Sequence, residues 1–285
     1  MAGSIKLIEP SVERWVQNDM WAHIAKCTRV CYQSRPRNSE TENEFCARTL
    51  LTNNHYGMLE HGTVYLKLPI SEANRYLNNP YSRVSEVISE ESNGAKTFYN
   101  TFVYITTNYR VLLENNWISD LQYECEQTEY NDERITLSFI ISTGIAREFT
   151  RHRKFSFAQE STRYVNYNKK DIEFIIPSWE NLNTGQYECT DGEIYGDGYI
   201  GNDIFLKSCI ESADNYTKLI ESGRKPQDAR EVLNLATKTQ LIMTGFKDDW
   251  DHFFELRCAS NAHPDAQYIA NKAKEEIYGN QGRSN

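Results

Sequence analysis

Apolar and polar residues alternate along several segments in the way that predicts β-strands. Residues 63–68 alternate strictly, as in a strand with one buried face. Residues 134–143 are rich in β-branched and aromatic side chains, which favour strands. Shorter runs at residues 5–9 and 171–176 indicate further strands, and Pro177 closes the second of them. The strands are therefore expected at the N-terminus and through the middle of the chain.

Other segments repeat their apolar residues at helical spacing. The predicted helices cover residues 18–30, 43–54, 108–123, 202–222, 227–243, 247–258 and 264–278, and residues 144–150 form a short helix or a turn. Residues 33–43 and 183–201 are polar or rich in Gly and acidic side chains, and we expect exposed loops there. Strands and helices that are mixed without regular β-α-β alternation predict an α+β fold.

One stretch, residues 69–133, lacks a sustained apolar pattern. A chain of 285 residues can form one large domain or two ordinary ones. Because this stretch shows no core of its own, we expect a single domain over residues 1–285 with an insertion at about 69–133.

The formal net charge of −9 restricts the partners of the chain. Nucleic acids and anionic membranes both attract basic surfaces, so we expect neither as a partner. No apolar run approaches the roughly 20 residues that cross a bilayer, and the N-terminus lacks the apolar core of a secretory signal. The seven cysteines form no Cys-x-x-Cys pair, so we expect reduced thiols, a cytoplasmic location and no metal site.

Positive charge is nevertheless concentrated in one short run. Arg151-His152-Arg153-Lys154 follows the predicted strand at 134–143, and Ser161 and Arg163 come shortly after it. Guanidinium groups are permanently charged and bind phosphate through two parallel hydrogen bonds. In an acidic chain such a run predicts a site for a phosphorylated ligand. A solvated basic patch or a nucleic-acid contact is the alternative interpretation of an isolated Arg-His-Arg triplet.

The run resembles the signature of the flavin-dependent thymidylate synthase (ThyX) family, in which Arg-His-Arg is followed after seven residues by Ser, here Ser161. Three other segments resemble the same family in the same order. They are His55-x4-Glu60-His61, Ala229-Arg230-x2-Leu233, and Phe253-x2-Leu256-Arg257 with Ala262-His263-Pro264 close behind. The resemblance extends from about residue 5 to about residue 278, apart from the insertion.

This resemblance implies a fold with a mixed, mainly antiparallel sheet flanked by helices, and an enzyme that converts dUMP to dTMP. It implies FAD as cofactor, methylenetetrahydrofolate as carbon donor and NADPH as reductant. It also implies a homotetramer whose active sites lie at subunit interfaces.

The family resemblance also implies a role for each site residue. FAD would be held by His55, Glu60, Arg151, His152, Arg153 and Lys154. The residues implied for dUMP are Glu148, Arg151, Gln159, Ser161, Thr162, Arg163, Arg257 and, from a neighbouring subunit, Arg230 as the phosphate clamp.

Two of these residues are candidates for a catalytic role. Negative charge grows on the uracil ring when a carbon is added at C5, and the fixed guanidinium of Arg257 can stabilise it. Ser161 is a possible nucleophile. No histidine–carboxylate pair stands near Ser161 in the sequence, however, and a phosphate or sugar contact explains this serine with less chemistry.

The chain departs from the family pattern at several places, among them Cys31 and the long 69–133 region. Leu233-Asn234 stands where many members have Leu-Pro, and residues 244–252 lack some Asn and Arg residues that contact FAD in relatives. The departures around residues 246–252 are the only support for one alternative, a flavin- or nucleotide-binding module without catalysis. The other alternative, a nucleic-acid-binding protein, is disfavoured by the acidic charge balance.

Overall fold

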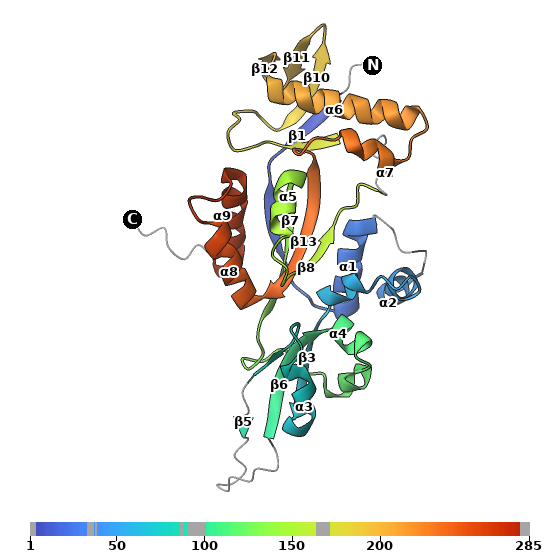
Figure 1. The fold of residues 1–285 in the computed structure, drawn as a ribbon, viewed down its shortest axis with the longest axis vertical. Helices are drawn as coiled ribbons and strands as arrows, with labels where there is room; N and C mark the ends of the chain where they lie inside the picture. The colour runs from blue at the N-terminus through green and yellow to red at the C-terminus, as the bar shows by residue number, and fades with distance from the viewer. Residues whose placement is uncertain are drawn as a thin grey trace.

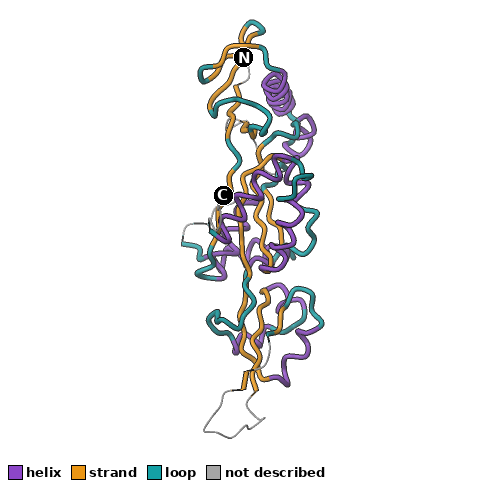
Figure 2. Tube along the Cα trace, turned by 90° about the vertical axis from the view of Figure 1, so that its left-hand side faces the viewer, coloured by secondary structure: helices purple, strands orange, loops and turns teal. Residues whose placement is uncertain are grey.

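The computed structural model describes residues 4–32, 37, 39–85, 88–89, 101–163 and 172–279. The molecule is elongated, and three sheets follow one another along its long axis (Figures 1 and 2). Helices pack beside each sheet, and most strand pairs are antiparallel. The predicted α+β class is therefore confirmed, with the strands divided among three sheets. None of the described helices is both long and apolar enough to cross a membrane.

The central sheet forms the middle of the molecule. Its strands, in spatial order, are β2 (Ser11–Trp15), β7 (Arg134–Ser142), β13 (Lys238–Phe246) and β8 (Ser156–Gln159), all antiparallel. The helices α5 (Thr143–Phe149), α8 (Lys247–Arg257) and α9 (Pro264–Tyr278) cover one face with a core of aromatic side chains. The helix α1 (Met20–Tyr32) packs on the other face against Ala158 and Ile242.

The predicted helix over residues 227–243 is wrong for most of its length. Only α7 (Pro226–Ala229) and the 3₁₀ helix η5 (Arg230–Val232) are helical; a connection at 233–237 follows, and residues 238–243 belong to β13. Both faces of β13 are buried, because Leu241 and Met243 face one core and Ile242 faces the other. A strand buried on both faces shows a continuous apolar run, which periodicity cannot distinguish from a helix.

A second sheet lies at the end of the molecule that holds the N-terminus (Figure 1). Its order is β12 (Tyr199–Gly201), β11 (Glu193–Gly196), β10 (Gly185–Thr190), β1 (Ser4–Ile8) and β9 (Ile172–Ile175), and only β1 and β9 run parallel. Apolar side chains of α6 (Ile204–Glu221) pack on this sheet.

Part of the second sheet corrects the expectation of an exposed loop over residues 183–201. The three strands β10, β11 and β12 occupy this stretch and are joined by tight turns. Asp191 and Gly192 link β10 to β11 with φ of 53° and 85°. Positive φ at both positions of a two-residue loop is the geometry that Asp-Gly favours in hairpins. The high content of Gly and acidic residues therefore marks hairpin turns.

The third sheet lies at the opposite end. Its strands are β3 (Thr63–Pro69), β6 (Thr101–Asn108) and β4 (Arg83–Val84), with β5 (Ile88–Ser89) also paired to β6. The helix α3 (Ile70–Leu77), the helix α4 (Tyr109–Glu114) and the 3₁₀ helix η3 (Ile118–Tyr123) supply the rest of its apolar cluster. Most of the segment predicted as an insertion lies here, and its division from the rest of the domain stays a prediction.

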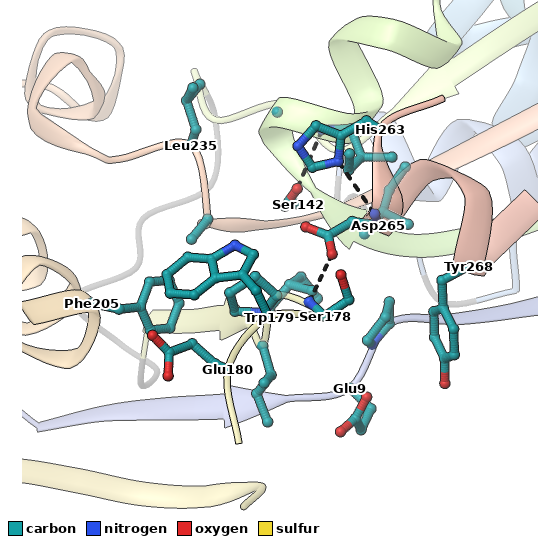
Figure 3. A pocket seen from close by; sticks show the side chains of 18 of the residues that line it. Glu9, Ser142, Ser178, Trp179, Glu180, Phe205, Leu235, His263, Asp265 and Tyr268 are labelled. Atoms are coloured by element: carbon teal, nitrogen blue, oxygen red, sulfur yellow. Dashed lines mark hydrogen bonds between the residues drawn. The ribbon is translucent and has the colours of Figure 1, made fainter. Parts of the chain in front are cut away.

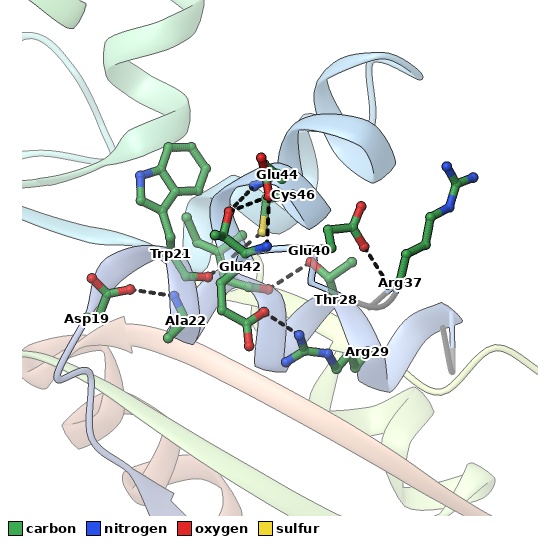
Figure 4. Close-up of polar contacts among 12 residues, drawn as sticks. Asp19, Trp21, Ala22, Thr28, Arg29, Arg37, Glu40, Glu42, Glu44 and Cys46 are labelled. Atoms are coloured by element: carbon green, nitrogen blue, oxygen red, sulfur yellow. Dashed lines mark hydrogen bonds and ion pairs between the residues drawn. The ribbon is translucent and has the colours of Figure 1, made fainter. Parts of the chain in front are cut away.

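The described part of the connection from α1 to β3 contains three short helical turns. They are α2 (Glu42–Cys46), the π-helical turn η1 (Ala47–Leu51) and the 3₁₀ helix η2 (Tyr56–His61). Thr41 and Glu44 form a reciprocal capping box that begins α2. Arg29 of α1 forms an ion pair with Glu42 of α2 (Figure 4), so the two helices are joined by charge as well as by apolar contacts.

Two histidines belong to a buried row of hydrogen-bonded side chains beside the central sheet. The Nε2 atom of His23 lies 3.2 Å from Oγ1 of Thr136, and the Nδ1 atom of His61 lies 2.7 Å from Oγ1 of Thr244. The two threonine hydroxyls are 2.8 Å apart and complete the row. Burial is the main reason why the pKa of His23 falls to about 4 and that of His61 to about 3.

We expect acid to destabilise the fold through these histidines. In the unfolded chain a histidine takes up a proton near its ordinary pKa of 6.5, whereas His23 stays neutral in the fold down to a pKa of about 4. Between these values the unfolded state binds more protons, so the free energy of unfolding falls as the pH drops. The expected loss is roughly 1.4 kcal/mol per pH unit for each histidine.

Urea unfolding of the wild type and of the double variant His23→Gln/His61→Asn measures this effect. Each amide replaces the ring nitrogen that contacts a threonine but does not titrate. The double variant should therefore show a much smaller loss of stability between about pH 6.5 and pH 4.5. An equally steep loss in both proteins would mean that other groups cause it.

Candidate active site

The cationic run forms a turn between α5 and β8. Ser142 caps the start of α5 by accepting a hydrogen bond from the backbone N–H of Ile145 at 3.2 Å. The turn then closes through backbone hydrogen bonds from His152 to Phe149 and from Phe155 to His152, both 3.1 Å. Phe149 and Phe155 are buried in the core. These two aromatic side chains anchor the turn beside the central sheet. We call residues 151–154 the arginine turn.

Most of the arginine turn is exposed. The side chains of Arg151, Arg153 and Lys154 lie at the surface, whereas His152 is half-buried. The Nζ atom of Lys154 lies 3.2 Å from Oδ1 of Asp249, whose side chain is only 3% exposed. The buried carboxylate of Asp249 is therefore paired with an exposed lysine, although it stands in an acidic run that begins a helix. The two guanidinium groups of the turn, on Arg151 and Arg153, are exposed and accessible to a ligand.

Arg257, at the end of α8, joins the arginine turn to α5. Its Nε donates to Nε2 of His152 at 3.0 Å, and its two terminal nitrogens donate to Oε2 and the backbone oxygen of Glu148 at 2.7 and 2.8 Å. Burial, followed by the nearby Arg257 charge, lowers the pKa of His152 to about 4. The ring is therefore neutral at pH 7 and accepts the hydrogen bond at Nε2. Three residues predicted for the site thus form one cluster, which we call the Arg257 cluster.

The segment after β8 forms a second group of predicted residues. The Nε2 atom of Gln159 donates to Oγ1 of Thr239 at 3.3 Å, and Oγ of Ser161 accepts from the backbone N–H of Arg163 at 3.4 Å. Arg230 donates to the hydroxyl of Thr162 at 3.3 Å. Arg230 and Thr162 therefore meet within one chain.

Arg230 and Thr162 line a small cavity of about 280 Å³ between α5 and η5. Its lining residues are Thr143, Arg147, Thr162, Arg230, Glu231, Leu233, Asn234 and Thr237. We call it the two-arginine cavity.

His55 and Glu60 lie apart from the Arg257 cluster. Both belong to the η2 region, which packs against β8 through Met58 and Ala158. The carboxylate of Glu60 is paired with Arg110, and its backbone oxygen accepts a hydrogen bond from Arg134 at 3.1 Å. His55 is exposed. These two predicted FAD contacts are therefore placed beside the strand that follows the arginine turn.

A larger cavity of about 690 Å³ adjoins the Arg257 cluster through Glu148. Figure 3 shows the aromatic side chains of Trp179 and Phe205 on one side of it and Tyr268 on another. Trp179 is 66% exposed and contacts the Phe205 ring edge to face. A third cavity, of about 1020 Å³, lies between β2, β3 and β7 and contains none of the predicted site residues.

Sequence reasoning missed two features next to the site, a buried ion pair and a cavity-lining arginine. Glu160, 6% exposed, pairs with Nζ of Lys238 at 2.9 Å, and Arg147 lines the two-arginine cavity. Lys238 stands far along the chain in a segment predicted to be helical, so no local pattern connects it to Glu160. Arg147 immediately precedes Glu148, but only the folded position of η5 places it beside Arg230.

Comparison with known proteins relates the chain to one family. Residues 114–279 match the family described as thymidylate synthase complementing protein. The flavin-dependent thymidylate synthase of Geobacter sulfurreducens is 28% identical over 46% of this chain and 50% of its own length. The enzyme of the same name from Pyrococcus furiosus is 30% identical over 51% of this chain and 55% of its own. The chain thus matches little more than half of the length of these relatives.

A solved structure was also compared with the chain. The UMP/dUMP methylase PolB from Streptomyces cacaoi, in a crystal structure with 5-Br dUMP, aligns with 96% of this chain and 92% of its own. The sequence identity is 17% and the TM-score is 0.41. A crystal structure of the same methylase with 5-Br UMP gives a TM-score of 0.42.

Proposed function

This chain belongs to the thymidylate synthase complementing protein family, and we propose that it is a flavin-dependent thymidylate synthase that methylates dUMP reductively to dTMP. The Arg257 cluster carries the proposal. It joins the end of α8 to α5 and the arginine turn through three hydrogen bonds from one guanidinium. A fixed cation of this kind suits a reaction in which negative charge develops on a pyrimidine.

The arginine turn fits the proposed FAD. Arg151, Arg153 and Lys154 are exposed cations, as the pyrophosphate of a dinucleotide requires. His55 and Glu60 would contribute from η2, beside β8. When bound, the flavin supplies the hydride and relays the carbon unit. The protein residues then bind, orient and polarise the substrate.

Arg257 and Glu148 are placed to handle the pyrimidine ring. Arg257 would donate to a ring carbonyl, and its hydrogen bonds to His152 and Glu148 hold its orientation. The carboxylate of Glu148 offers an acceptor for a ring N–H. Because His152 stays neutral down to a pKa of about 4, it does not compete as a second cation. We assign Arg257 as the catalytic residue and keep Ser161 as a binding residue, with nucleophilic catalysis as its less favoured role.

The remaining substrate contacts would come from the segment after β8. Gln159, Ser161, Thr162 and Arg163 would bind the sugar and phosphate, together with Arg151 and Arg230. Arg230 was expected from a neighbouring subunit. Within one chain it donates to the hydroxyl of Thr162 at 3.3 Å, and this pair would clamp the phosphate of a nucleotide bound at the interface with a neighbouring subunit.

Methylenetetrahydrofolate as carbon donor, NADPH as reductant and a homotetramer with sites at its interfaces complete the proposal. A cytoplasmic location is part of the same proposal, because the cysteine pattern of the sequence predicts reduced thiols.

A turnover assay with omitted components tests this function. The purified chain should form dTMP only when FAD, dUMP, methylenetetrahydrofolate and NADPH are all present. Formation of dTMP without FAD would contradict the flavin mechanism. Binding of both FAD and dUMP without any dTMP would favour the inactive binding module instead.

A further inference from the structure

A single buried carboxylate lies between the arginine turn and the third sheet. Asp249 belongs to the first turn of α8, and its side chain is 3% exposed. Its Oδ1 atom lies 3.2 Å from Nζ of Lys154 in the arginine turn. Its Oδ2 atom lies 3.8 Å from Nη2 of Arg83 in β4 of the third sheet. Each oxygen of this carboxylate therefore faces a cation from a different part of the molecule.

Arg83 attaches the third sheet to the start of α8. Its strand β4 pairs with β6, where Arg83 lies opposite Thr106. Its guanidinium carbon lies 4.3 Å from the centre of the Phe246 ring, a cation–π contact with the residue that precedes α8. Its Nη2 atom also lies 3.5 Å from Oδ2 of Asp248. Arg83 lies outside residues 114–279, which match the family, so this attachment is a feature of the segment predicted as an insertion.

The two cations beside Asp249 are unequally shielded from water. Lys154 is 73% exposed, whereas Arg83 is 28% exposed. Ion pairs of exposed side chains are weak because water screens them. No described residue donates a hydrogen bond to Oδ1 of Asp249. A carboxylate that is removed from water needs compensating charge, so Asp249 depends on Arg83 as well as on the exposed lysine.

Arg83 also decides how much positive charge Lys154 can offer to a ligand. With Arg83 present, two cations and one carboxylate leave one net positive charge at this end of the arginine turn. Without Arg83, Asp249 would cancel the charge of Lys154 and hold its ammonium group. Asp248 is 67% exposed, so water screens its charge. The affinity of the arginine turn for an anion therefore depends on a residue of the third sheet.

We propose that Arg83 is a positioning residue of the cofactor site, because it neutralises Asp249 and so leaves Lys154 of the arginine turn to bind the phosphates of FAD. This inference rests on the proposed function for the identity of the cofactor. It concerns the charge of the arginine turn and not the other walls of the FAD site, which neighbouring subunits complete in the proposed tetramer. The third sheet then contributes to the affinity for FAD without contacting the cofactor.

Titration of FAD into the full chain, followed by flavin fluorescence, tests the role of Arg83. Arg83→Gln removes the charge, and we expect it to raise the Kd for FAD about three- to tenfold. Arg83→Lys keeps a charge beside Asp249 and should give an intermediate Kd. The difference between the wild type and Arg83→Gln should shrink at high salt, because added ions screen these charges. At saturating FAD the kcat of Arg83→Gln should lie within about twofold of the wild type, since only cofactor binding is weakened.

A substitution at Asp249 separates the effect of charge from an effect on structure. Loss of one partner leaves a buried charge uncompensated, whereas loss of both partners is close to neutral. The double variant Arg83→Gln/Asp249→Asn should therefore bind FAD with a Kd within about twofold of the wild type. Asp249→Asn alone should not raise the Kd, because it releases Lys154, and this comparison needs no variant of Arg83. A double variant that fails to restore FAD binding, or a raised Kd in Asp249→Asn, would overturn the proposal.

Arg75→Gln is the matched control within the same sheet. The Nη2 atom of Arg75, in α3, lies 2.6 Å from Oδ1 of Asp120, whose side chain is also 3% exposed. The ion pairs of Arg75 with Glu72 and Asp120 both stay within residues 69–133. This variant should disturb the third sheet but leave the Kd for FAD unchanged. An equal rise of the Kd in Arg75→Gln and Arg83→Gln would attribute the effect to the stability of the sheet and overturn the proposal.

Failure of the inference and failure of the proposed function give different results. If the wild type forms dTMP while Arg83→Gln binds FAD with an unchanged Kd, only the role of Arg83 is lost. If the wild type binds FAD but forms no dTMP, and Arg83→Gln still weakens FAD binding, the role of Arg83 stands and the synthase activity does not. A wild type that binds no FAD would overturn both.

Discussion

Replacement of Arg257 by lysine is expected to lower thymidylate synthesis by roughly two to three orders of magnitude while the protein stays folded and binds flavin. Lysine keeps the positive charge but loses the planar fork that bridges His152 and Glu148. The loss should appear in kcat, because the guanidinium acts on charge that develops in the transition state. Steady-state kinetics with dUMP as the varied substrate measures it.

The fold should tolerate this change. The Glu148 side chain is 33% exposed, so water can replace the lost donor. Arg224→Lys is the control for the same exchange at an exposed position. If Arg257→Lys and Arg257→Ala both turn over at nearly the normal rate, Arg257 has no catalytic role. If either variant loses flavin binding together with turnover, Arg257 acts only in maintaining the structure.

Replacement of Lys238 by methionine is expected to destabilise the fold by about 3 kcal/mol or more. The Nζ atom of Lys238 lies 2.9 Å from Oε2 of Glu160, whose side chain is only 4% exposed. Without the lysine this buried carboxylate would lose the cation that lies 2.9 Å from it. The segment that carries Gln159 and Ser161 contains Glu160, so the same variant should also weaken dUMP binding. Urea unfolding at neutral pH gives the change in stability.

Two further variants isolate the buried pair. Glu160→Gln in the Lys238→Met background removes the stranded charge and should recover most of the lost stability. Arg14→Met is the control, because the Arg14–Glu133 pair is 36% and 35% exposed and should cost less than about 1 kcal/mol. If Lys238→Met and Arg14→Met have the same effect, the pair between Lys238 and Glu160 contributes no more than a surface ion pair.

The arginine turn was predictable from the sequence because its signal is local. A strong strand, a short helix and a run of cations follow one another over residues 134–154, and the structure retains that order as β7, α5 and the turn. The helix that ends at Arg257 was likewise predicted. The contact between Arg257 and Glu148 follows from pairing of β7 with β13, which places α5 and α8 in the same apolar core.

The parts that were missed depend on partners far along the chain. The strand β13 resembles a buried helix because both of its faces are covered, by α8 on one side and α1 on the other. The pair of Lys238 and Glu160 joins residues 78 positions apart. No pattern in the sequence around Glu160 indicates that Lys238 will pair with its carboxylate.

The visible absorption spectrum of the purified chain with FAD, recorded before and after addition of dUMP, tests the central claim most directly. That claim is that the arginine turn and the Arg257 cluster form one site for flavin and nucleotide. The account predicts protein-bound flavin bands that shift when dUMP is added, with the shift lost in Arg257→Ala. A protein that retains no flavin, or a flavin spectrum that dUMP leaves unchanged, would contradict it.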